Sequence, residues 1–459
     1  MKYTIDKAND FIGKNKDSIN KTYRHKFHLM PLVGWMNDPN GFIHYNGHYH
    51  LFFQHYPYKT EWGPMHWGHA KSKDLITWTH LPVALAPDLP HEDGCFSGGA
   101  IEHDGKLLLM YTSHYDTNFR LEEQSLAISN NEIVFNKTEK PIITANDLPK
   151  NSSKENFRDP NPIVINGEIF ILIGNETKNH EGQILVYKTT DFKSFSLLNI
   201  IKHPLFGQVA ECPDLFELNG KHVLLFSATN LEKGNNSFKN INSSLYAIGN
   251  FNTKTGEFIF EHIGELDAGH HFYAPQTTSK NERLLVAWME MWHKPYYTAL
   301  NGHNWVGAIT LPRILNVRNN RLYQEPFNID KYVIKEIDIS KTNTIKTYNY
   351  FILEGTIKTN NETVIFIGSN DDLIKLIINK KEVILDTSNT SLYPLEARSI
   401  NHNLKEINFK LIMDNSSLEL FVKDVDKTIT TRVYMKSDIS FITHDNKVLK
   451  RLVLKELDK

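Results

Sequence analysis

Short apolar stretches alternate with polar residues along most of the chain, and turn residues separate them. The runs HLFFQ at 50–54, KLLLMY at 106–111 and EIFILIG at 168–174 are typical. Short apolar runs rich in aromatic and branched residues predict β-strands. The N-terminal stretch 1–22 is different, because its charged and apolar residues alternate in the manner of a short amphipathic helix. The pattern therefore predicts an all-β protein with one short helix at its start.

One degenerate unit recurs five times in the first two thirds of the chain. Each copy contains small residues or proline near its start, an apolar strand, a turn and a second apolar strand. The first four copies place Asn-Gly or Asp-Gly at the turn, which is the strongest short-range signal for a β-hairpin. Five hairpins are therefore predicted, in units that begin at residues 38, 96, 159, 211 and 273.

The spacing of the units, roughly 50 to 65 residues, leaves room for two more strands after each hairpin. Four-stranded units repeated around an axis form a β-propeller, whose radial repetition protects the sheet edges. Residues 1–330 are therefore predicted to form a five-bladed β-propeller that includes the helix within 1–22. The alternative is an antiparallel sandwich with fortuitous turn spacing, but hairpins seldom return so evenly in a sandwich of this length.

The last part of the chain lacks the repeated unit. Segments such as YFILEGTI, LIKLIIN and SLELFV are short alternating strands, and clusters of turn residues separate them. This arrangement is typical of an antiparallel β-sandwich. Residues 335–459 are therefore predicted to form a second, all-β domain. Nothing in it resembles a catalytic constellation, so an architectural role is expected.

Carboxylates stand at the first position of three of the five units: Asp38, Asp159 and Glu211. The innermost strand of each propeller blade faces the central channel, so equivalent positions should converge near the axis. Clustered carboxylates repel one another, and a fold does not gather them for packing alone. The alternative for each residue by itself is that it caps a strand or bonds a turn amide. Arg158, beside Asp159, is the expected charge partner of that carboxylate.

Two carboxylates that flank a glycosidic bond are the usual machinery of glycoside hydrolysis. One attacks the anomeric carbon, and the other protonates the leaving oxygen, which requires burial or a negative neighbour to raise its pKa. Tryptophans near the predicted strand ends could stack on a sugar and exclude water from it. These tryptophans are Trp35, Trp62, Trp67 and Trp292. The propeller is therefore expected to be the catalytic domain of a glycosidase.

Several motifs resemble those of glycoside hydrolase family 32, the invertase and fructosidase family. WMNDPNG at 35–41 resembles the family's nucleophile motif and implies that Asp38 is the nucleophile. FRDP at 157–160 resembles the block whose aspartate, here Asp159, binds fructose hydroxyls and stabilises the transition state. Glu211 in AECPD resembles the general acid/base.

The resemblance runs from about residue 23 to LPRIL at 311–315, and SLELFV at 417–422 echoes the family's C-terminal sandwich. It agrees with the five-bladed propeller and sandwich predicted above. Together with the aromatic residues it predicts a set of substrate contacts. These are Trp35, Met36, Asn37, Gln54, Trp62, Phe96, Ser97, Arg158, Tyr273 and Trp292.

Two departures from the family pattern bear on specificity. His270-His271 stands where family members commonly have an acidic residue before FYA, and Gly99 stands where many have serine. Neither departure removes a predicted catalytic group. We expect both to alter hydroxyl contacts at the rim of the site, and therefore the choice of leaving group.

The resemblance implies a retaining β-fructosidase, a β-fructofuranosidase that acts on fructose-containing oligosaccharides. It would hydrolyse the terminal β-fructofuranosyl linkage of sucrose, sucrose 6-phosphate or short fructo-oligosaccharides through a covalent fructosyl-enzyme. Three alternatives stay open: a fructosyltransferase, an inverting five-bladed glycosidase, and a non-catalytic sugar-binding propeller. Lys59, His293 and Lys294 could meet a phosphate on the substrate, although surface solvation is the simpler expectation.

Composition narrows the partners. The 459 residues carry a net charge of -2, which gives no global field for nucleic acid or an anionic membrane. There is no apolar segment of the length that a signal peptide or membrane span needs, and Cys95 and Cys212 are the only cysteines. A cytoplasmic location is therefore expected. His48 and His50 lack companion ligands, so neither a metal nor a cofactor is predicted, and the sequence leaves the oligomeric state open.

Overall fold

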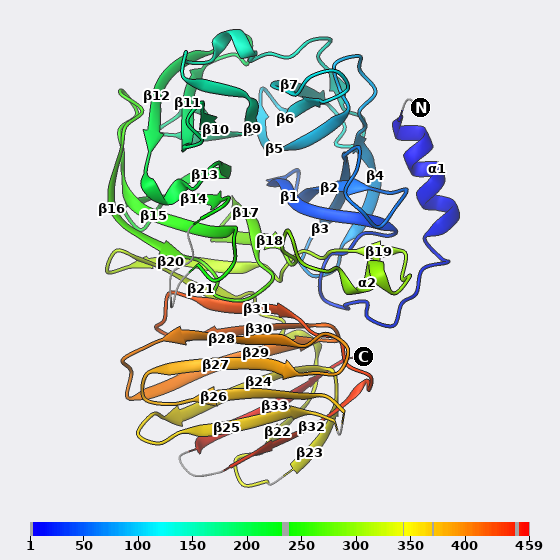
Figure 1. The fold of residues 1–459 in the computed structure, drawn as a ribbon, viewed down its shortest axis with the longest axis vertical. Helices are drawn as coiled ribbons and strands as arrows, with labels where there is room; N and C mark the ends of the chain where they lie inside the picture. Colours follow the sequence, from blue (N-terminus) through cyan, green and yellow to red (C-terminus); the bar gives the residue numbers. More distant parts are fainter. Residues whose placement is uncertain (1–2, 232–237, 343, 370, 446–448, 459) are drawn as a thin grey trace.

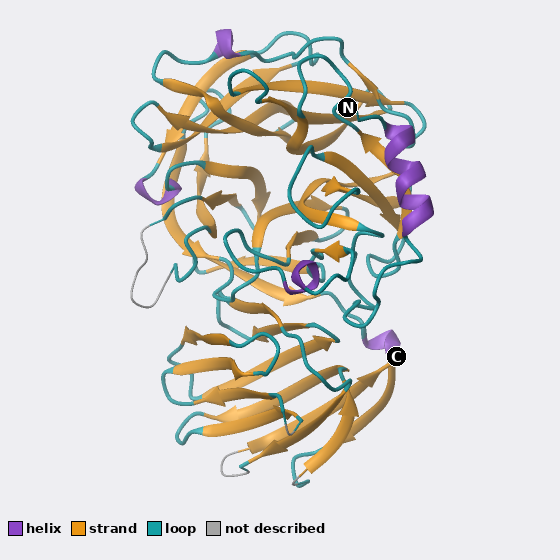
Figure 2. Ribbon diagram, turned by 45° about the vertical axis from the view of Figure 1, so that its right-hand side comes forward, coloured by secondary structure: helices purple, strands orange, loops and turns teal. Residues whose placement is uncertain are grey.

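The structure is a computed structural model that describes residues 3–231, 238–342, 344–369, 371–445 and 449–458. The ends of the predicted domains, residues 1–2 and 459, lie outside these ranges. Figure 1 shows a ring of sheets above a pair of stacked sheets, and Figure 2 shows that strands make up most of both parts. Among the described residues no helix has the length and apolar character needed to cross a membrane.

Five sheets surround a common centre and form the predicted five-bladed propeller (Figure 1). The first blade contains β1 (Gly34–Tyr45), β2 (His48–Tyr56), β3 (His66–Ser72), β4 (Thr79–Leu85) and β19 (Trp305–Val306). The second contains β5 (Gly94–His103), β6 (Lys106–Tyr115), β7 (Leu121–Ser129) and β8 (Asn136–Lys137). The third contains β9 (Ser152–Ile165), β10 (Glu168–Thr177), β11 (Gly182–Thr189) and β12 (Ser196–Lys202).

The last two blades follow the same order from inside to outside. The fourth contains β13 (Ala210–Leu218), β14 (Lys221–Ala228), β15 (Ser243–Phe251) and β16 (Phe258–Glu265). The fifth contains β17 (Tyr273–Ser279), β18 (Arg283–Trp288), β20 (Arg313–Arg318) and β21 (Arg321–Pro326). Strand β19, which follows β18 in the chain, pairs in parallel with β1 of the first blade and links the last blade to the first.

Every innermost strand carries a β-bulge near the start of the repeated unit. The pairing register shifts in β1 between Met36 and Pro39, and comparable shifts occur in the other four blades. A bulge adds an unpaired residue, bends the strand and redirects the side chains beside it. The bulged residues Asp159, Cys212 and Ala274 have φ angles of 64°, 48° and 51°, a strained region for residues other than glycine. The repeat therefore marks the place where each blade turns side chains toward the axis.

Two six-stranded antiparallel sheets form the predicted sandwich, with apolar side chains between them. One sheet contains β22 (Val333–Asp338), β33 (Leu449–Leu457), β24 (Tyr350–Lys358), β29 (Glu406–Asp414), β30 (Ser417–Val422) and β31 (Thr428–Arg432). The other contains β23 (Thr344–Tyr348), β32 (Ile439–His444), β25 (Thr363–Gly368), β26 (Leu373–Ile378), β27 (Glu382–Asn389) and β28 (Leu395–Asn401). The last strand of the propeller sheets ends at Pro326, and the first strand of the sandwich begins at Val333.

Helices are few and short. Within the predicted helical region 1–22, helix α1 extends from Ile5 to Asn15 and lies beside β4, the outer strand of the first blade (Figure 1). Thr4 caps its N-terminus by accepting a hydrogen bond from the backbone N–H of Lys7. The other helical segments are single turns: α2 (Tyr297–Leu300), η1 (Ala145–Asp147), η2 (Pro204–Phe206) and η3 (Asp330–Tyr332).

Buried charges join the two domains. Arg313 on β20 donates to Asp267 at 3.2 Å and, across the interface, to Glu419 on β30 at 2.9 Å. His28 lies between Asp414 and Glu419, with N···O distances of 2.6 and 3.0 Å. Burial alone would lower the pKa of His28, but the hydrogen bonds with these carboxylates outweigh it and raise the pKa to about 9. The sandwich is therefore fixed to the propeller by paired charges that water does not reach.

Candidate active site

Asp38, Asp159 and Glu211 line one cavity of about 600 Å³. They come from β1, β9 and β13, whose bulged ends converge at the centre of the ring (Figure 1). Asp38 and Asp159 are buried, with 9% and 4% of their surface exposed. The carboxylates that are distant in sequence are thus brought together, as the repeat predicts.

The structural register corrects one part of that prediction. Asp159, Cys212 and Ala274 occupy matching positions, each the first unpaired residue of a bulge and each followed by proline. Asp38 is the second unpaired residue of its bulge, and Glu211 is the last paired residue before its bulge, so the three carboxylates do not occupy equivalent positions. A bulge shifts the register without changing the apolar pattern, so an alignment of the turns does not detect it. Glu211 still reaches the cavity, although Cys212 is the residue of its strand that matches Asp159.

Asp38 is held by donors in a dry environment. The hydroxyl of Ser97 donates to Asp38 Oδ2 at 2.8 Å. Burial and the negative charge of Glu211 raise the pKa of Asp38 to about 6, while the Ser97 hydrogen bond opposes that rise. Asn37 stands beside Asp38 and accepts a 2.7 Å hydrogen bond from the indole N–H of Trp35. Asp38 is therefore an ionisable, poorly solvated carboxylate, which is the state that a nucleophile requires.

Cys212 lies between the two aspartates. Its backbone N–H donates to Asp159 Oδ2 at 2.9 Å, and its Sγ is 3.5 Å from that oxygen and 3.9 Å from Asp38 Oδ2. Burial and the negative charge of Glu211 raise the pKa of Asp159 well above its usual range. Burial and Asp159 likewise raise the pKa of the Cys212 thiol, which keeps it protonated. Cys212 is thus a small neutral donor between carboxyl groups.

Glu211 is oriented from two sides. The hydroxyl of Tyr273 donates to Glu211 Oε2 at 2.7 Å, and Arg158 Nη1 donates to Oε1 at 3.1 Å. Arg158 also donates from Nε to the buried Glu122 at 2.9 Å. Burial would lower the pKa of Arg158, but Glu122 and Glu211 outweigh it and keep the guanidinium charged. The close ion pairs of Arg158 are therefore with Glu122 and Glu211, while burial raises the pKa of Asp159 and the charge of Arg158 opposes that rise, as expected of a charge partner.

Seven of the ten predicted substrate contacts line the cavity. These are Asn37, Gln54, Trp62, Phe96, Ser97, Arg158 and Trp292. Trp62 is 48% exposed and meets Phe96 edge to face, so an aromatic wall stands beside the carboxylates.

The other three predicted contacts lie behind the cavity wall. Met36 points away from the cavity into an apolar cluster with Leu29, because neighbouring strand residues face opposite sides of a sheet. Trp35 is buried against Trp292 and holds Asn37. Tyr273 is buried and holds Glu211. We therefore correct the assignment of Trp35 and Tyr273 from substrate contact to support of residues that line the cavity, and that of Met36 to the apolar core.

The two departures from the family pattern also lie away from the rim. His270 and His271 are buried against the sandwich, where the backbone N–H of Arg432 donates to His271 Nδ1 at 3.0 Å. A side chain at Gly99 would bring its Cβ to 2.3 Å from Asn161 Oδ1 and 2.8 Å from Pro162 on the neighbouring blade. Both positions therefore serve packing between structural units, which corrects the expectation that they alter hydroxyl contacts.

Sequence reasoning missed much of the cavity mouth. The missed lining residues come from loops and strand ends and belong to no motif. They include His114, Asp116, Arg120, Asn156, Gln208, Val209, Thr229, Asn230 and Asn242. Of the residues considered for phosphate, His293 lines the cavity, whereas Lys59 pairs with Glu61 beside a separate pocket.

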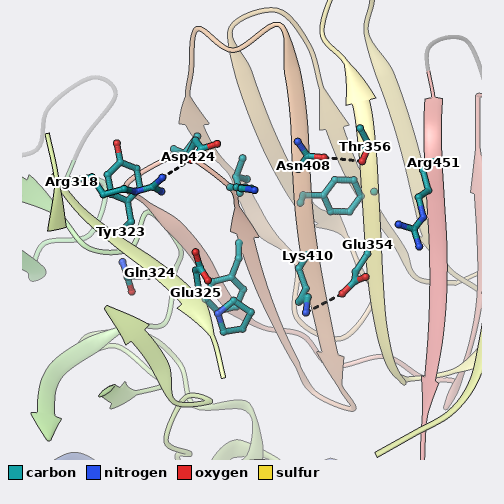
Figure 3. Close-up of a pocket in the computed structure, with 17 residues that line it drawn as sticks. Arg318, Tyr323, Gln324, Glu325, Glu354, Thr356, Asn408, Lys410, Asp424 and Arg451 are labelled. Carbon is teal, nitrogen blue, oxygen red and sulfur yellow. Dashed lines mark hydrogen bonds and ion pairs between the residues drawn. The ribbon is translucent and has the colours of Figure 1, made fainter. Parts of the chain in front are cut away.

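Two further groups lie outside this cavity. Among the described residues, His25, His28 and Asp414 are close enough to share an ion, but both nitrogens of His28 already pair with carboxylates. A hollow of about 420 Å³ separates β21 from the sandwich (Figure 3). There the ion pair of Arg318 with Asp424 lies over the ring of Tyr323.

Comparison with known proteins places this geometry in a family. Residues 28–326 match the model for the glycosyl hydrolases family 32 N-terminal domain, and residues 336–456 match that for its C-terminal domain. Raffinose invertase from Escherichia coli is 32% identical over 95% of each chain. Sucrose-6-phosphate hydrolase from the same organism is 32% identical, with 93% of this chain and 92% of the relative covered.

Solved structures agree with the sequence matches. The beta-fructofuranosidase of Bombyx mori has 32% identity and a TM-score of 0.89, with 99% of this chain and 98% of that chain covered. Sucrose-6-phosphate hydrolase from Lactobacillus gasseri has 26% identity and a TM-score of 0.90, with 100% and 99% covered. Both domains, the full-length relatives and the cluster of carboxyl groups lead to one conclusion: the chain is a glycoside hydrolase that belongs to glycosyl hydrolases family 32.

Proposed function

We propose that the protein is a retaining β-fructofuranosidase. Its substrates would be fructose-containing oligosaccharides, namely sucrose, sucrose 6-phosphate or short fructo-oligosaccharides, cleaved at the terminal β-fructofuranosyl linkage. The observation that carries the proposal is that Asp38 and Glu211 line one cavity in distinct environments. The printed names of the relatives support the substrate class, as does a solved complex of a Bombyx mori enzyme variant with sucrose.

The proposed first step joins the fructosyl unit to the protein. Asp38 attacks C2 of the fructosyl unit while Glu211 gives a proton to the bridging oxygen, which leaves as the hydroxyl of the second sugar. Tyr273 and Arg158 hold the Glu211 carboxyl for this transfer. Retention requires the two carboxyl groups to lie about 5–5.5 Å apart.

The second step releases fructose. Glu211, now a carboxylate, takes a proton from water, and the resulting hydroxide oxygen displaces Asp38 from C2. Asp159 is positioned beside Asp38 to bond sugar hydroxyls more strongly as positive charge develops on the ring. Removing its interactions would therefore slow both steps.

Variants of the two carboxylates test the proposal. We expect Asp38→Ala and Glu211→Ala each to lose most sucrose hydrolysis while remaining folded, as judged by circular dichroism. With a fructoside whose leaving group needs no protonation, azide should restore turnover to Glu211→Ala by attacking the fructosyl-enzyme, and it should not restore Asp38→Ala, which forms no such intermediate. Near-normal hydrolysis by either variant would refute the assignment.

The first-formed anomer separates the remaining mechanisms. An inverting enzyme needs its carboxyl groups about 6.5–9.5 Å apart to admit a water, and it would release the opposite anomer in an NMR time course. A fructosyltransferase would release glucose without an equal amount of fructose, and a binding propeller would release neither sugar. We propose a cytoplasmic location on the separate ground that both cysteines are free and buried.

A further inference from the structure

The cavity separates its charges by depth. Its inner part holds the buried acids Asp38 and Asp159. The outer lining residues that are exposed or half-buried include the bases Arg120 and His293. Among the described lining residues, Asp116 is the one exposed acid. A ligand that enters therefore meets Arg120 and His293 before it reaches the two buried aspartates.

Of the two arginines that line the cavity, Arg120 has the less compensated charge. Its Nη2 lies 3.2 Å from Glu122 Oε1, and 39% of its side chain is exposed. The same carboxyl group already bonds Arg158 through Oε2 and His114 through Oε1. One buried carboxylate thus serves two guanidinium groups, whereas Arg158 alone has Glu211 as a second partner.

The path of the leaving sugar runs toward this group. Glu211 protonates the bridging oxygen in the proposed reaction, so the leaving sugar lies beyond Glu211, away from the buried aspartates. Arg158 connects Glu211 to Glu122, and Glu122 connects to Arg120. Three ion pairs thus link Glu211 to Arg120, and both residues line the cavity that the leaving sugar would occupy.

We propose that Arg120 recognises a phosphate group on the leaving sugar and selects sucrose 6-phosphate over sucrose. The inference rests on the proposed function and concerns the same cavity. A guanidinium group offers paired N–H donors that match two phosphate oxygens, and 39% of the Arg120 side chain is exposed. The contact of Nη2 with Glu122 restrains the side chain beside the cavity. Asp116 lies in the same loop as Arg120 and repels a phosphate. It therefore restricts where the phosphate group can bind and adds no affinity.

Steady-state kinetics with both substrates test this proposal. We expect Arg120→Gln to lower kcat/KM for sucrose 6-phosphate by roughly 10- to 100-fold, the effect of losing hydrogen bonds to a charged group. Its kcat/KM for sucrose should stay within about threefold, and Arg120→Lys should lie between the wild type and Arg120→Gln. Arg318→Gln is the matched control, because Arg318 is also an exposed arginine in an ion pair but lies outside the cavity (Figure 3).

The ratio of kcat/KM for sucrose 6-phosphate to kcat/KM for sucrose distinguishes phosphate recognition from a structural role of Arg120. If Arg120 only supports Glu122 and Arg158, both substrates lose activity equally, and the proposal is overturned. A wild-type enzyme that prefers sucrose, or an Arg120→Gln variant with unchanged preference, also overturns it. A wild-type enzyme that hydrolyses neither substrate instead refutes the proposed function, so the two failures can be told apart. Inhibition by glucose 6-phosphate, compared with glucose, should weaken in parallel in Arg120→Gln.

Discussion

The hydroxyl of Ser97 should set the lower pH limit of activity. It donates to Asp38 Oδ2 at 2.8 Å and stabilises the charged form of a carboxyl whose pKa is raised to about 6. Activity requires ionised Asp38, so kcat/KM should fall as the pH drops below about 6 in the wild type. Replacing Ser97 with alanine removes a donor that favours the carboxylate, and the pKa of Asp38 should rise further.

The size of this shift follows from the hydrogen bond. A hydrogen bond to a charged group contributes about 1.5–3 kcal/mol, and the protonated carboxyl retains part of it. One pKa unit corresponds to about 1.4 kcal/mol. The lower value predicts that the pKa of Asp38 rises by about one unit, to about 7. At pH 6 the ionised fraction of Asp38 would therefore be roughly fivefold lower in the variant than in the wild type, whereas near pH 8 it would change little.

A pH profile of kcat/KM for sucrose measures the shift directly. Ser97→Thr retains a hydroxyl and should keep its acid limb near the wild-type position. Ser113→Ala removes a buried hydroxyl of the same blade that bonds Ser125 and Glu92, and should leave the limb unmoved. If the pKa read from the acidic side of the profile for Ser97→Ala lies within about 0.3 units of the wild-type value, the reasoning is refuted, even if the maximal kcat/KM has changed.

Three further outcomes concern stability. Arg313→Met should lower the free energy of unfolding in urea by about 3–5 kcal/mol, because Asp267 and Glu419 remain buried without their partner. Arg318→Met breaks an exposed ion pair and should lower it by at most about 1 kcal/mol. Equal losses in the two variants would contradict this explanation. The pKa of His28 is raised to about 9 in the folded protein, so its contribution to the free energy of unfolding should be complete below pH 6.5 and disappear as the pH rises through about 9. The loss of stability in His28→Gln should therefore shrink over that range, and a constant loss would contradict this reasoning. Gly99→Ser should destabilise the propeller by about 1–3 kcal/mol in the same assay, and a neutral effect would show that the blades can separate there.

The sequence predicts the fold well because the propeller is built from repeated local signals. Each hairpin carries its own turn residues, and the units that begin at 38, 96, 159, 211 and 273 all start within innermost strands. The bulges were not predictable, since the additional residue changes hydrogen bonding while the apolar pattern stays the same. For this reason the spatial convergence of Glu211 was foreseen but its register was not.

The site was predicted only where its residues stand in motifs on the innermost strands. Asn37 and Ser97 line the cavity, yet their neighbour Met36 faces the core, because motif membership does not say which side of a strand a residue faces. Arg120 lies near the end of a loop, and its partner Glu122 begins a strand with no local signal of its role. His271 shows the opposite case, in which an unusual residue near a motif serves the domain interface.

Mass spectrometry of a trapped intermediate tests the central claim most directly. Glu211→Ala can be mixed with a fructoside whose leaving group needs no protonation, quenched in acid and digested. The account predicts one added fructosyl mass on the peptide that contains Asp38, and no such mass in the Asp38→Ala, Glu211→Ala double variant. A fructosyl mass on another residue, or turnover of this fructoside by the double variant, would contradict it.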